Sequence, residues 1–287
     1  MTNKTLHIPF TKMHGIGNDY IYINCLETPI DNPSLLSIEM SPRHTSIGSD
    51  GIILICRSEI ADFKMRIFNA DGSEALMCGN GCRCVGKYVY DHNLTNKTEL
   101  TLETLSGVKH LYLHVNKNTD KVNEVTVDMG SPSFNRSAIG LNYPQDEMIE
   151  ARITTSLGEK AITGISMGNP HGVIFINTLD GFDITHIGPE LENHSMWNDR
   201  ANIEFAEVVD EHTIKMRVWE RGSGETMACG TGACATAVAA IRTGRAVSPV
   251  TVKLLGGDLK ISIEKSTGHV MMQGSATEVF TGIYCRC

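Results

Sequence analysis

Hydrophobic and polar positions alternate over short distances along most of this chain. Short apolar runs, bounded by Gly, Pro, Asn or Asp, include YIYIN (20–24), IILIC (52–56), VKHLYLHV (108–115), GVIFIN (172–177) and TIKMRVW (213–219). Runs of this length, rich in β-branched residues, are typical of strands. Helices are expected over LLSIEM (35–40), over 184–197 and after two of the cysteines. The pattern predicts an α/β (α+β) protein in which strands outnumber helices.

One segment of the chain occurs twice. RIFNADGSEALMCGNGCRC (66–84) aligns without a gap on RVWERGSGETMACGTGACA (217–235), so that each matched pair lies 151 positions apart. The Gly-Asn pairs at 17–18 and 168–169 fall at the same offset, each just before an apolar run. A constant offset across half the chain indicates an internal duplication, with two copies of one structural unit.

The duplication predicts two domains. A stretch rich in Ser, Pro and polar residues, 131–147, follows the strands of the first copy, and we expect the crossover just before it, near residue 128. The charged stretch 147–152 is interpreted as a solvated surface.

Each copy of the repeat ends a strand-like segment with Cys-Gly-x-Gly and then begins a helix. Apolar or small residues recur at helical spacing after Cys78, and the segment after Cys229 is small and apolar on all sides, as in a buried helix. Both cysteines are therefore expected at helix N-termini, where unpaired N–H groups and the helix dipole favour an anion. We expect a lowered thiol pKa there, and the adjacent glycines let backbone amides approach a bound carboxylate.

Two activated thiols, one in each half, suit one kind of reaction. One thiol removes the proton from an α-carbon and the other returns a proton to the opposite face, which racemises or epimerises an amino acid. A buried cysteine before a helix is, taken singly, usually a packing residue. Duplication in matching turns favours catalysis for Cys78 and Cys229, whereas Cys82, Cys84 and Cys234 lie inside the helices and are interpreted as packing residues.

Composition and charge narrow the class of protein. The 287 residues carry 25 basic and 33 acidic side chains without a basic block, which argues against nucleic acid as a partner. No apolar run is long enough to span a membrane, and the N-terminus lacks the apolar core of a signal peptide. Nine cysteines without an export signal indicate free thiols in a reducing cytoplasm.

Several motifs together resemble one enzyme family. KMHGIGNDY (12–20), RIFNADGSEALMCGNGCRC (66–84), GNPH (168–171), WERGSGETMACGTGACA (219–235) and ATEVFTG (276–282) are similar, in kind and in order, to motifs of the diaminopimelate epimerases. The resemblance implies two pseudo-symmetric domains, each a mixed, curled β-sheet around a central helix, with the active site in the interdomain cleft. It also implies that the C-terminal segment 276–287 returns to the N-terminal domain (1–128), and that 129–275 form the C-terminal domain.

The same resemblance implies an activity. The reaction interconverts LL- and meso-2,6-diaminopimelate, a precursor of lysine and peptidoglycan, without pyridoxal phosphate, another cofactor or a metal. The implied assembly is a homodimer. Cys78 and Cys229 would be the two bases, and His171 and Glu220 would assist the thiols and bind the substrate amine.

The resemblance also implies a set of substrate-binding residues. The distal amino acid end would be bound by Asn18, Asn69, Asn169, Asn202 and Arg221, and the reacting carboxylate by Gly79, Asn80, Gly230 and Thr231. Many family members carry Gln where this chain has Gly51, so a substrate contact is expected to be absent or water-mediated. Cys82 stands where Ala is usual, which is interpreted as a packing change.

Other interpretations remain open at this stage. A proline or hydroxyproline racemase would use opposed thiols on the same fold, although the Asn set and WERG suit a longer substrate. A zinc-binding or redox-switch protein would use Cys78, Cys82 and Cys84, but this cluster lacks the paired CxxC spacing of structural zinc sites. The repeated Arg66 and Arg217 are interpreted as structural, each paired with the glutamate eight positions on.

Overall fold

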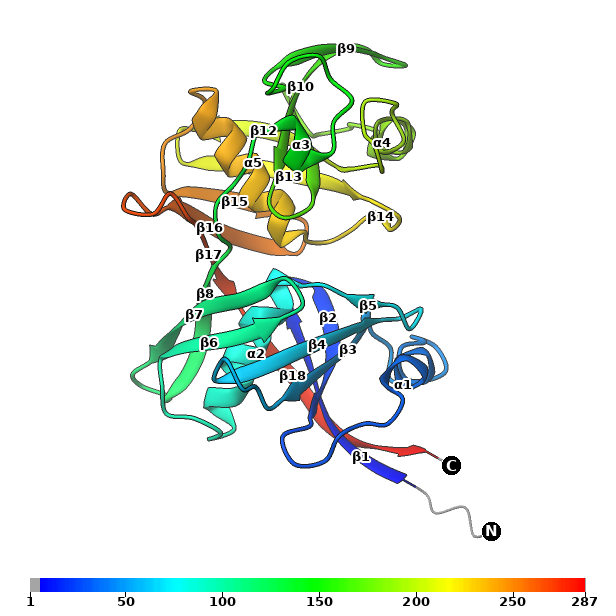
Figure 1. The fold of residues 1–287 in the computed structure, drawn as a ribbon, viewed down its shortest axis with the longest axis vertical. Helices are drawn as coiled ribbons and strands as arrows, with labels where there is room; N and C mark the ends of the chain where they lie inside the picture. Colours follow the sequence, from blue (N-terminus) through cyan, green and yellow to red (C-terminus); the bar gives the residue numbers. More distant parts are fainter. Residues whose placement is uncertain (1–5, 287) are drawn as a thin grey trace. The chain divides into compact units, whose positions relative to one another are not determined.

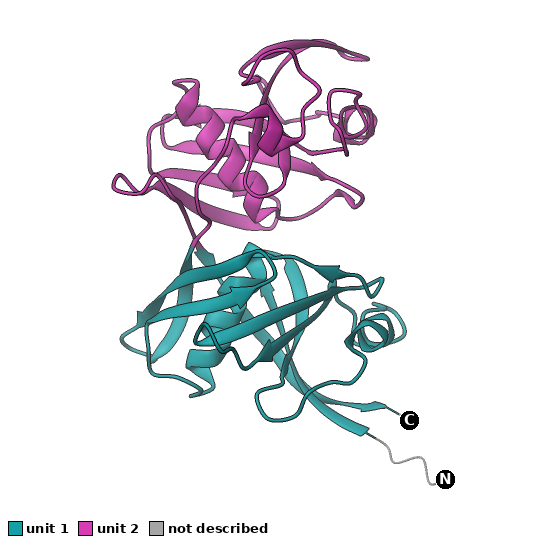
Figure 2. Ribbon diagram, viewed as in Figure 1, with its two compact units in different colours: residues 1–127, 274–287 teal, residues 128–273 magenta. Residues whose placement is uncertain are grey.

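A computed structural model describes residues 6–286 of the chain. The chain divides into two compact units, which Figure 2 colours separately. The first unit extends to Val127 and resumes at Gly274, and the second is Asp128–Gln273.

The first unit is a mixed sheet that curves around one helix (Figure 1). Its elements are β1 (Leu6–Gly15), β2 (Asn18–Asn24), α1 (Pro33–Met40), β3 (Gly51–Cys56), β4 (Phe63–Asn69), β5 (Glu74–Ala75), α2 (Gly79–Asp91), β6 (Glu99–Thr104), β7 (Gly107–Asn116), β8 (Lys121–Asp128) and β18 (Thr277–Arg286). The strands pair in the order β18-β1-β2-β3-β4-β6-β7-β8, with β2–β3 and β4–β6 parallel and the other pairs antiparallel. Because α2 contacts β18 and β1 at one end of this order and β7 near the other, the sheet encloses it.

The second unit repeats this architecture. Its elements are α3 (Arg136–Ile139), β9 (Ala151–Thr155), β10 (Gly158–Ser166), β11 (Pro170–Phe175), α4 (Ile184–Glu192), β12 (Asn202–Asp210), β13 (Thr213–Glu220), β14 (Gly224–Glu225), α5 (Gly230–Arg242), β15 (Val250–Leu254), β16 (Gly257–Ile263) and β17 (Val270–Ser275). The strands pair in the order β9-β10-β11-β12-β13-β15-β16-β17. Strand β9 pairs with β10 as β18 pairs with β1, and α5 contacts six strands of the sheet.

The repeat found in the sequence is confirmed in the backbone. Helix α5 begins and ends 151 positions after helix α2. Strands β2 and β3 pair in parallel, as do β11 and β12, and each residue pair of the first ladder has its counterpart 151 positions later in the second. Arg66 forms a two-bond ion pair with Glu74, and Arg217 forms the same pair with Glu225, both with a shortest distance of 2.7 Å. The structural interpretation of the two arginines is therefore confirmed.

Each sheet is covered on both faces, which explains its near-continuous apolar strands. Helix α2 or α5 packs on the inner face, and α1 or α4 packs on the outer face over a cluster of buried Ile, Leu, Met and Phe side chains. The two outer helices have capping residues at equivalent positions of the repeat. The side chain of Asn32 accepts a hydrogen bond from a backbone amide of α1, and that of Asp183 accepts from two backbone amides of α4.

One of the sequence expectations needs correction. The helix expected over 184–197 ends at Glu192, where Asn193 donates a side-chain hydrogen bond to the carbonyl of Pro189 at 2.8 Å. The chain then turns, so that the Trp197 indole reaches the Leu191 carbonyl at 2.8 Å and packs in the core. In the stretch 147–152, the charged residues Glu147, Glu150 and Arg152 are exposed, as expected of a solvated surface. The same stretch leads into strand β9, whose pairing with β10 the local charge pattern does not reveal.

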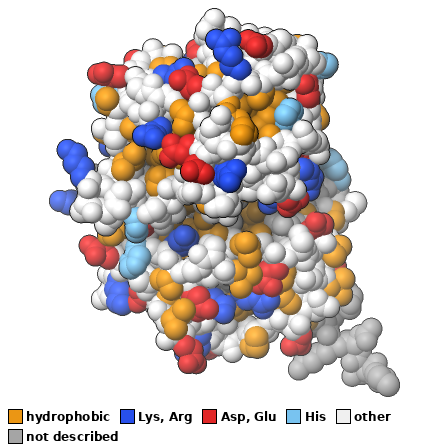
Figure 3. Space-filling model, turned by 45° about the horizontal axis from the view of Figure 1, so that its top comes forward, with side chains coloured by type: hydrophobic (Ala, Val, Ile, Leu, Met, Phe, Trp, Pro, Cys, Tyr) orange, Lys and Arg blue, Asp and Glu red, His pale blue; other side chains and the backbone are white. Residues whose placement is uncertain are grey.

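The surface of the described residues is mixed in charge. Figure 3 shows Lys and Arg side chains scattered among Asp and Glu on the face in view. Within residues 6–286, no helix is both long and apolar enough to cross a membrane.

Candidate active site

The thiol of the first unit lies where three strands and one helix meet. Strand β2 begins at Asn18, its parallel neighbour β3 begins at Gly51, and the antiparallel β4 ends at Asn69, so these residues share one edge of the sheet. Cys78 caps helix α2, and its sulfur accepts a hydrogen bond from the Gly81 amide at 3.3 Å. The thiol therefore occupies the helix N-terminus that its motif predicts.

An oriented amide faces this thiol. Cys78 Sγ donates to Asn18 Oδ1 at 3.3 Å, and Asn80 Nδ2 donates to the same oxygen at 3.3 Å. On the other side, Asn18 Nδ2 donates to Asp50 Oδ2 at 2.8 Å. Because the carboxylate only accepts, it holds the amide with its oxygen toward the sulfur.

A charge network holds Asp50 in turn. Arg43 bonds both Asp50 and Asp19 at 2.7 Å, and the buried ammonium of Lys12 pairs with Asp19. Burial raises the pKa of Asp19, but the hydrogen bonds and charges of Arg43 and Lys12 outweigh it and leave that pKa below its usual value. Sequence reasoning missed this network, although acidic residues next to both Gly-rich turns were a signal for it.

The second thiol lies at the equivalent edge of its own sheet. Strand β12 begins at Asn202, β13 ends at Glu220, and Cys229 immediately precedes α5. Thr231 Oγ1 lies 3.5 Å from Cys229 Sγ and accepts a hydrogen bond from Asn169 Nδ2 at 3.4 Å. This Asn–Thr contact stands at the 151-residue offset from the Asn18–Asn80 contact.

A histidine and a carboxylate stand behind this arrangement. His171 is 0 % exposed; its Nδ1 lies 2.7 Å from Glu204 Oε1 and its Nε2 lies 3.0 Å from Asn169 Oδ1. Sequence reasoning selected His171 but missed Glu204. The signal was available, because a charged residue inside the apolar run of a strand is normally paired.

The expected lowering of the thiol pKa is wrong for Cys229. Burial raises the pKa of Cys229 well above its ordinary value, and the negative charges of Glu220 and Glu204 add to the rise. The Thr231 hydroxyl and the Gly232 amide act in the opposite direction but do not outweigh it. Burial also raises the pKa of Glu220, whose carboxylate accepts a hydrogen bond from the Thr226 hydroxyl. The helix N-terminus stabilises the thiolate of Cys229, but desolvation and the two carboxylates destabilise it by more.

This electrostatic arrangement predicts how Cys229 reacts with iodoacetamide. A raised pKa means that the thiolate fraction is small at about pH 8 and still increases above it, so alkylation should accelerate with pH without levelling off. Glu220→Gln removes one nearby negative charge, which should lower the pKa of Cys229 and speed alkylation at about pH 8 by roughly 3–10-fold. Mass spectrometry of the peptide containing Cys229 measures the rate. Glu225→Gln is the control, and an unchanged or slower rate in Glu220→Gln would contradict the assignment.

The remaining candidate residues lie at the same two edges. Asn69 Nδ2 donates to Ser73 Oγ at 3.0 Å, within the turn after β4. Asn202 Oδ1 accepts from the Arg221 backbone amide at 2.9 Å, and Asn202 Nδ2 donates to the Pro170 carbonyl at 3.3 Å. The Arg221 guanidinium is held by Asp199, at 2.9 Å from its carbonyl and 3.2 Å from its carboxylate. Gly79, Asn80, Gly230 and Thr231 are the first residues of α2 and α5.

Comparison with known proteins shows the family. The family model for diaminopimelate epimerase matches residues 10–135 and 163–279. A diaminopimelate epimerase of Agathobacter rectalis is 52% identical over 280 residues, covering 95% of this chain and 98% of its own length. One of Bacteroides thetaiotaomicron is 53% identical over 279 residues, covering 97% and 98%. The chain belongs to the diaminopimelate epimerase family.

Solved structures show how widely this fold is shared. A PhzF-family phenazine biosynthesis protein of Bacillus anthracis superposes with a TM-score of 0.69 at 16% identity, covering 97% of this chain and 99% of its own. A hydroxyproline epimerase of Agrobacterium vitis superposes with a TM-score of 0.67 at 13% identity, covering 97% and 91%. At such low identity the similarity establishes the fold, the predicted mixed sheet around a helix, and nothing further.

The backbone at Gly51 leaves no room for a side chain. Gly51 has φ +154°, and a Cβ placed on it would lie 2.1 Å from the carbonyl oxygen of Phe68 on the paired strand β4. A side chain at this position therefore requires a different backbone. The matched position in the second unit carries Asn202, which has the polar side chain that the first unit lacks.

The other cysteines of the two helices lie in the core of their units. Cys82, Cys84 and Cys234 are fully buried, which confirms their interpretation as packing residues. Burial raises the pKa of Cys82 and of Cys84. Among the residues that the structure describes, no cluster of three or more His, Cys, Asp or Glu side chains could hold a metal ion.

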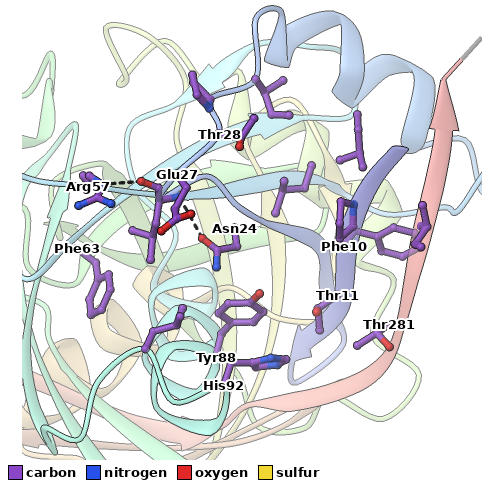
Figure 4. Close-up of a pocket in the computed structure, with 18 of the residues that line it drawn as sticks. Phe10, Thr11, Asn24, Glu27, Thr28, Arg57, Phe63, Tyr88, His92 and Thr281 are labelled. Carbon is purple, nitrogen blue, oxygen red and sulfur yellow. Dashed lines mark hydrogen bonds between the residues drawn. The ribbon is translucent and has the colours of Figure 1, made fainter. Parts of the chain in front are cut away.

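The first unit also contains a cavity of about 1320 Å³ that is separate from the candidate site (Figure 4). It is lined by β1, β2, β18 and the last turns of α2, with Phe10, Asn24, Arg57, Tyr88 and His92 around it. Cys78 stands at the other end of α2, a helix about 20 Å long. None of the candidate site residues lines this cavity.

Proposed function

We propose that this protein is a diaminopimelate epimerase, an isomerase that interconverts LL- and meso-2,6-diaminopimelate. Membership of the family at 52% and 53% identity to curated enzymes over nearly the whole chain supports the substrate. The observation that carries the proposal is the matched pair Cys78 and Cys229, each at the start of the buried helix of its unit.

The proposed reaction is a two-base proton transfer without a cofactor. The thiolate of one cysteine takes the α-proton and becomes a thiol, and the electron pair stays on the substrate as a carbanion delocalised into its carboxylate. The thiol of the other cysteine gives its proton to the opposite face of the carbon and becomes a thiolate. The substrate loses one proton and gains one, and the two cysteines exchange protonation states.

The first turns of α2 and α5 are proposed to stabilise the charge that develops. Gly79, Asn80, Gly230 and Thr231 offer backbone amides at the positive ends of the helix dipoles, where the reacting carboxylate would bind. Glu220 is proposed to tune the Cys229 thiol and to bind the substrate amine, and His171, whose two ring nitrogens face Glu204 and Asn169, is proposed to act on the thiol through Asn169 and Thr231. Preorganised donors of this kind contribute most where charge appears in the transition state.

The distal amino acid end of the substrate is proposed to bind polar groups at the two sheet edges. The proposed residues are Asn18, Asn69, Asn169, Asn202 and Arg221. The guanidinium of Arg221, which holds Asp199 in this structure, would exchange that carboxylate for the substrate's and can bind it through two hydrogen bonds. Binding the non-reacting end supplies specificity and fixes the reactive carbon.

The wider setting is proposed from family membership. The two compact units would act as two domains, each carrying one thiol. The enzyme would act as a homodimer in the reducing cytoplasm, without nucleic acid or membrane as a partner, and supply meso-diaminopimelate for lysine and peptidoglycan synthesis.

Incubation with LL-diaminopimelate in heavy water tests the proposal. Proton NMR should show loss of the α-proton signal together with appearance of the meso isomer. A parallel tube contains proline, because a hydroxyproline epimerase shares the fold. Exchange with proline alone would keep the two-thiol chemistry and overturn the substrate, and a reduced, folded protein that is silent in both tubes would overturn the function.

A further inference from the structure

Glu204 is a buried carboxylate that the proposed reaction does not use. It lies on β12, between β11 and β13, in a run from Asn202 to Ala206 that is buried throughout. Its side chain is 0 % exposed, and its Oε1 lies 2.7 Å from His171 Nδ1. Among the residues described, its Oε2 has no hydrogen-bond partner. A carboxylate removed from water in this way is unfavourable unless a positive charge or donor compensates it.

The duplicated unit shows that the fold does not require this carboxylate. The position matched to Glu204 is Ile53, which is also fully buried, on β3. A Cβ on Gly81, near the start of α2, would meet Ile53 Cδ1 at 2.8 Å, and a Cβ on the matched Gly232 would meet Glu204 Oε1 at 2.7 Å. The two side chains thus fill the same space beneath a helix N-terminus, and only the second unit places a charge there.

The hydrogen bonds from Glu204 run toward the thiol of its unit. His171 joins Glu204 through Nδ1 and Asn169 Oδ1 through Nε2, at 2.7 and 3.0 Å. Both ring nitrogens therefore face oxygen acceptors, which suits an imidazolium that donates from both. With its oxygen engaged, Asn169 turns its Nδ2 toward Thr231 Oγ1, at 3.4 Å. Once Thr231 accepts that bond, its own O–H is left to point at Cys229 Sγ, 3.5 Å away.

The first unit orients its matched amide in the opposite direction. There Asp50 accepts from Asn18 Nδ2, which leaves the amide oxygen to accept from the Cys78 thiol. In the second unit a donor, His171, takes the amide oxygen, so that a hydroxyl donor reaches the sulfur. At the first thiol, the Asn18 amide oxygen thus accepts a hydrogen bond from Cys78 S–H. At the second thiol, the Thr231 hydroxyl donates toward Cys229 Sγ.

We propose that Glu204 is a positioning residue that holds His171 as an imidazolium and thereby sets the direction of the hydrogen-bond relay His171–Asn169–Thr231 toward Cys229. The inference rests on the proposed function for its catalytic consequence. A neutral His171 with its proton on Nδ1 would accept at Nε2, turn the Asn169 amide over and draw the Thr231 hydroxyl away from the sulfur. The other titratable groups that act on this cluster are Glu220 and Cys229 itself.

Nitrogen-15 NMR of ring-labelled histidine tests the relay independently of activity. In the reduced, full-length wild type at about pH 7.5, both His171 ring nitrogens should give shifts of the protonated form. In Glu204→Gln one ring nitrogen should move to the unprotonated range, and kcat/KM on LL-diaminopimelate should fall by roughly 10–100-fold. A double-mutant cycle with Thr231→Val should show that the two losses are not additive, because both variants remove the same donor from Cys229.

Glu207→Gln is the matched control. Glu207 lies on the same strand and accepts hydrogen bonds from the Leu179 amide and Lys215, outside the relay, so the His171 shifts and turnover should stay as in the wild type. If Glu204→Gln does not fold, Glu204→Ile, which carries the residue of the matched position, replaces it. Two protonated ring nitrogens in either folded variant would overturn the proposal. An inactive wild type with the predicted shifts would instead overturn the proposed function and leave the relay in place.

Discussion

Replacing either Cys78 or Cys229 with alanine should reduce kcat for diaminopimelate epimerisation by roughly 10³–10⁴-fold or more, because each variant lacks one of the two proton-transfer groups. Each variant should retain, at most, exchange of the α-proton on the face where the other thiol acts. Epimerisation requires delivery of a proton to the opposite face, which the remaining thiol cannot make. Proton NMR in heavy water separates the two events, since exchange without inversion removes the α-proton signal without forming the other stereoisomer.

The repeat supplies a matched control for the cysteine variants. The position of Cys82 in the second unit is Ala233, so Cys82→Ala changes a buried thiol on α2 to the residue that the equivalent helix already carries. We expect a small loss of stability, about 1 kcal/mol, and activity within about twofold of the wild type. Turnover above a tenth of the wild-type rate in either Cys78→Ala or Cys229→Ala would rule out the two-thiol mechanism.

A second large effect is expected on stability, at Gly51. A Cβ on Gly51 would lie 2.1 Å from the Phe68 carbonyl oxygen, and the φ of +154° is one that L side chains rarely adopt. The paired backbones of β3 and β4 must separate to accept Gly51→Ala, at the edge of the sheet where Asn18 and Asn69 stand. We expect a decrease of roughly 3–5 kcal/mol in the free energy of unfolding, measured by urea denaturation of the first unit's transition.

Gly107→Ala separates the two causes of this loss. Gly107 has φ +98°, but no atom lies within 4 Å of the Cβ that would be added, so its variant carries backbone strain without a clash. A loss of about 1 kcal/mol is expected there. Equal losses at the two positions would show that the contact with Phe68 is unimportant. Gly51→Gln, which adds an amide at the position matched to Asn202, should be no more stable than Gly51→Ala and should not tighten substrate binding.

Several features of the fold could be predicted from the sequence because they depend on residues close together in the chain. Cys78 and Cys229 were placed at helix starts from a Cys-Gly-x-Gly turn followed by small apolar residues, and both helices begin one residue later. Arg66 and Glu74, eight positions apart, are brought together because β4 turns directly into its antiparallel partner β5. Short-range spacing decides such features, so the sequence is sufficient for them.

Local spacing failed where the chain makes a tertiary contact. The exposed charges of Glu147, Glu150 and Arg152 resemble a solvated surface, and they do not reveal that Arg152 lies on strand β9, which pairs with β10. Helix α4 stops at Glu192 because the chain must turn to bury Trp197, a requirement that the pattern of 184–197 does not contain.

The sequence by itself determined the duplication, the two thiols and the family of this protein. The electrostatic character of the second thiol was decided only by the tertiary structure. Helix position alone predicts a lowered pKa for Cys229, but burial and the carboxylates of Glu220 and Glu204 raise it. Those carboxylates come from two different strands, and His171 comes from a third. The pKa of a buried group depends on the charges and the desolvation that surround it in space, and the order of residues along the chain does not specify them.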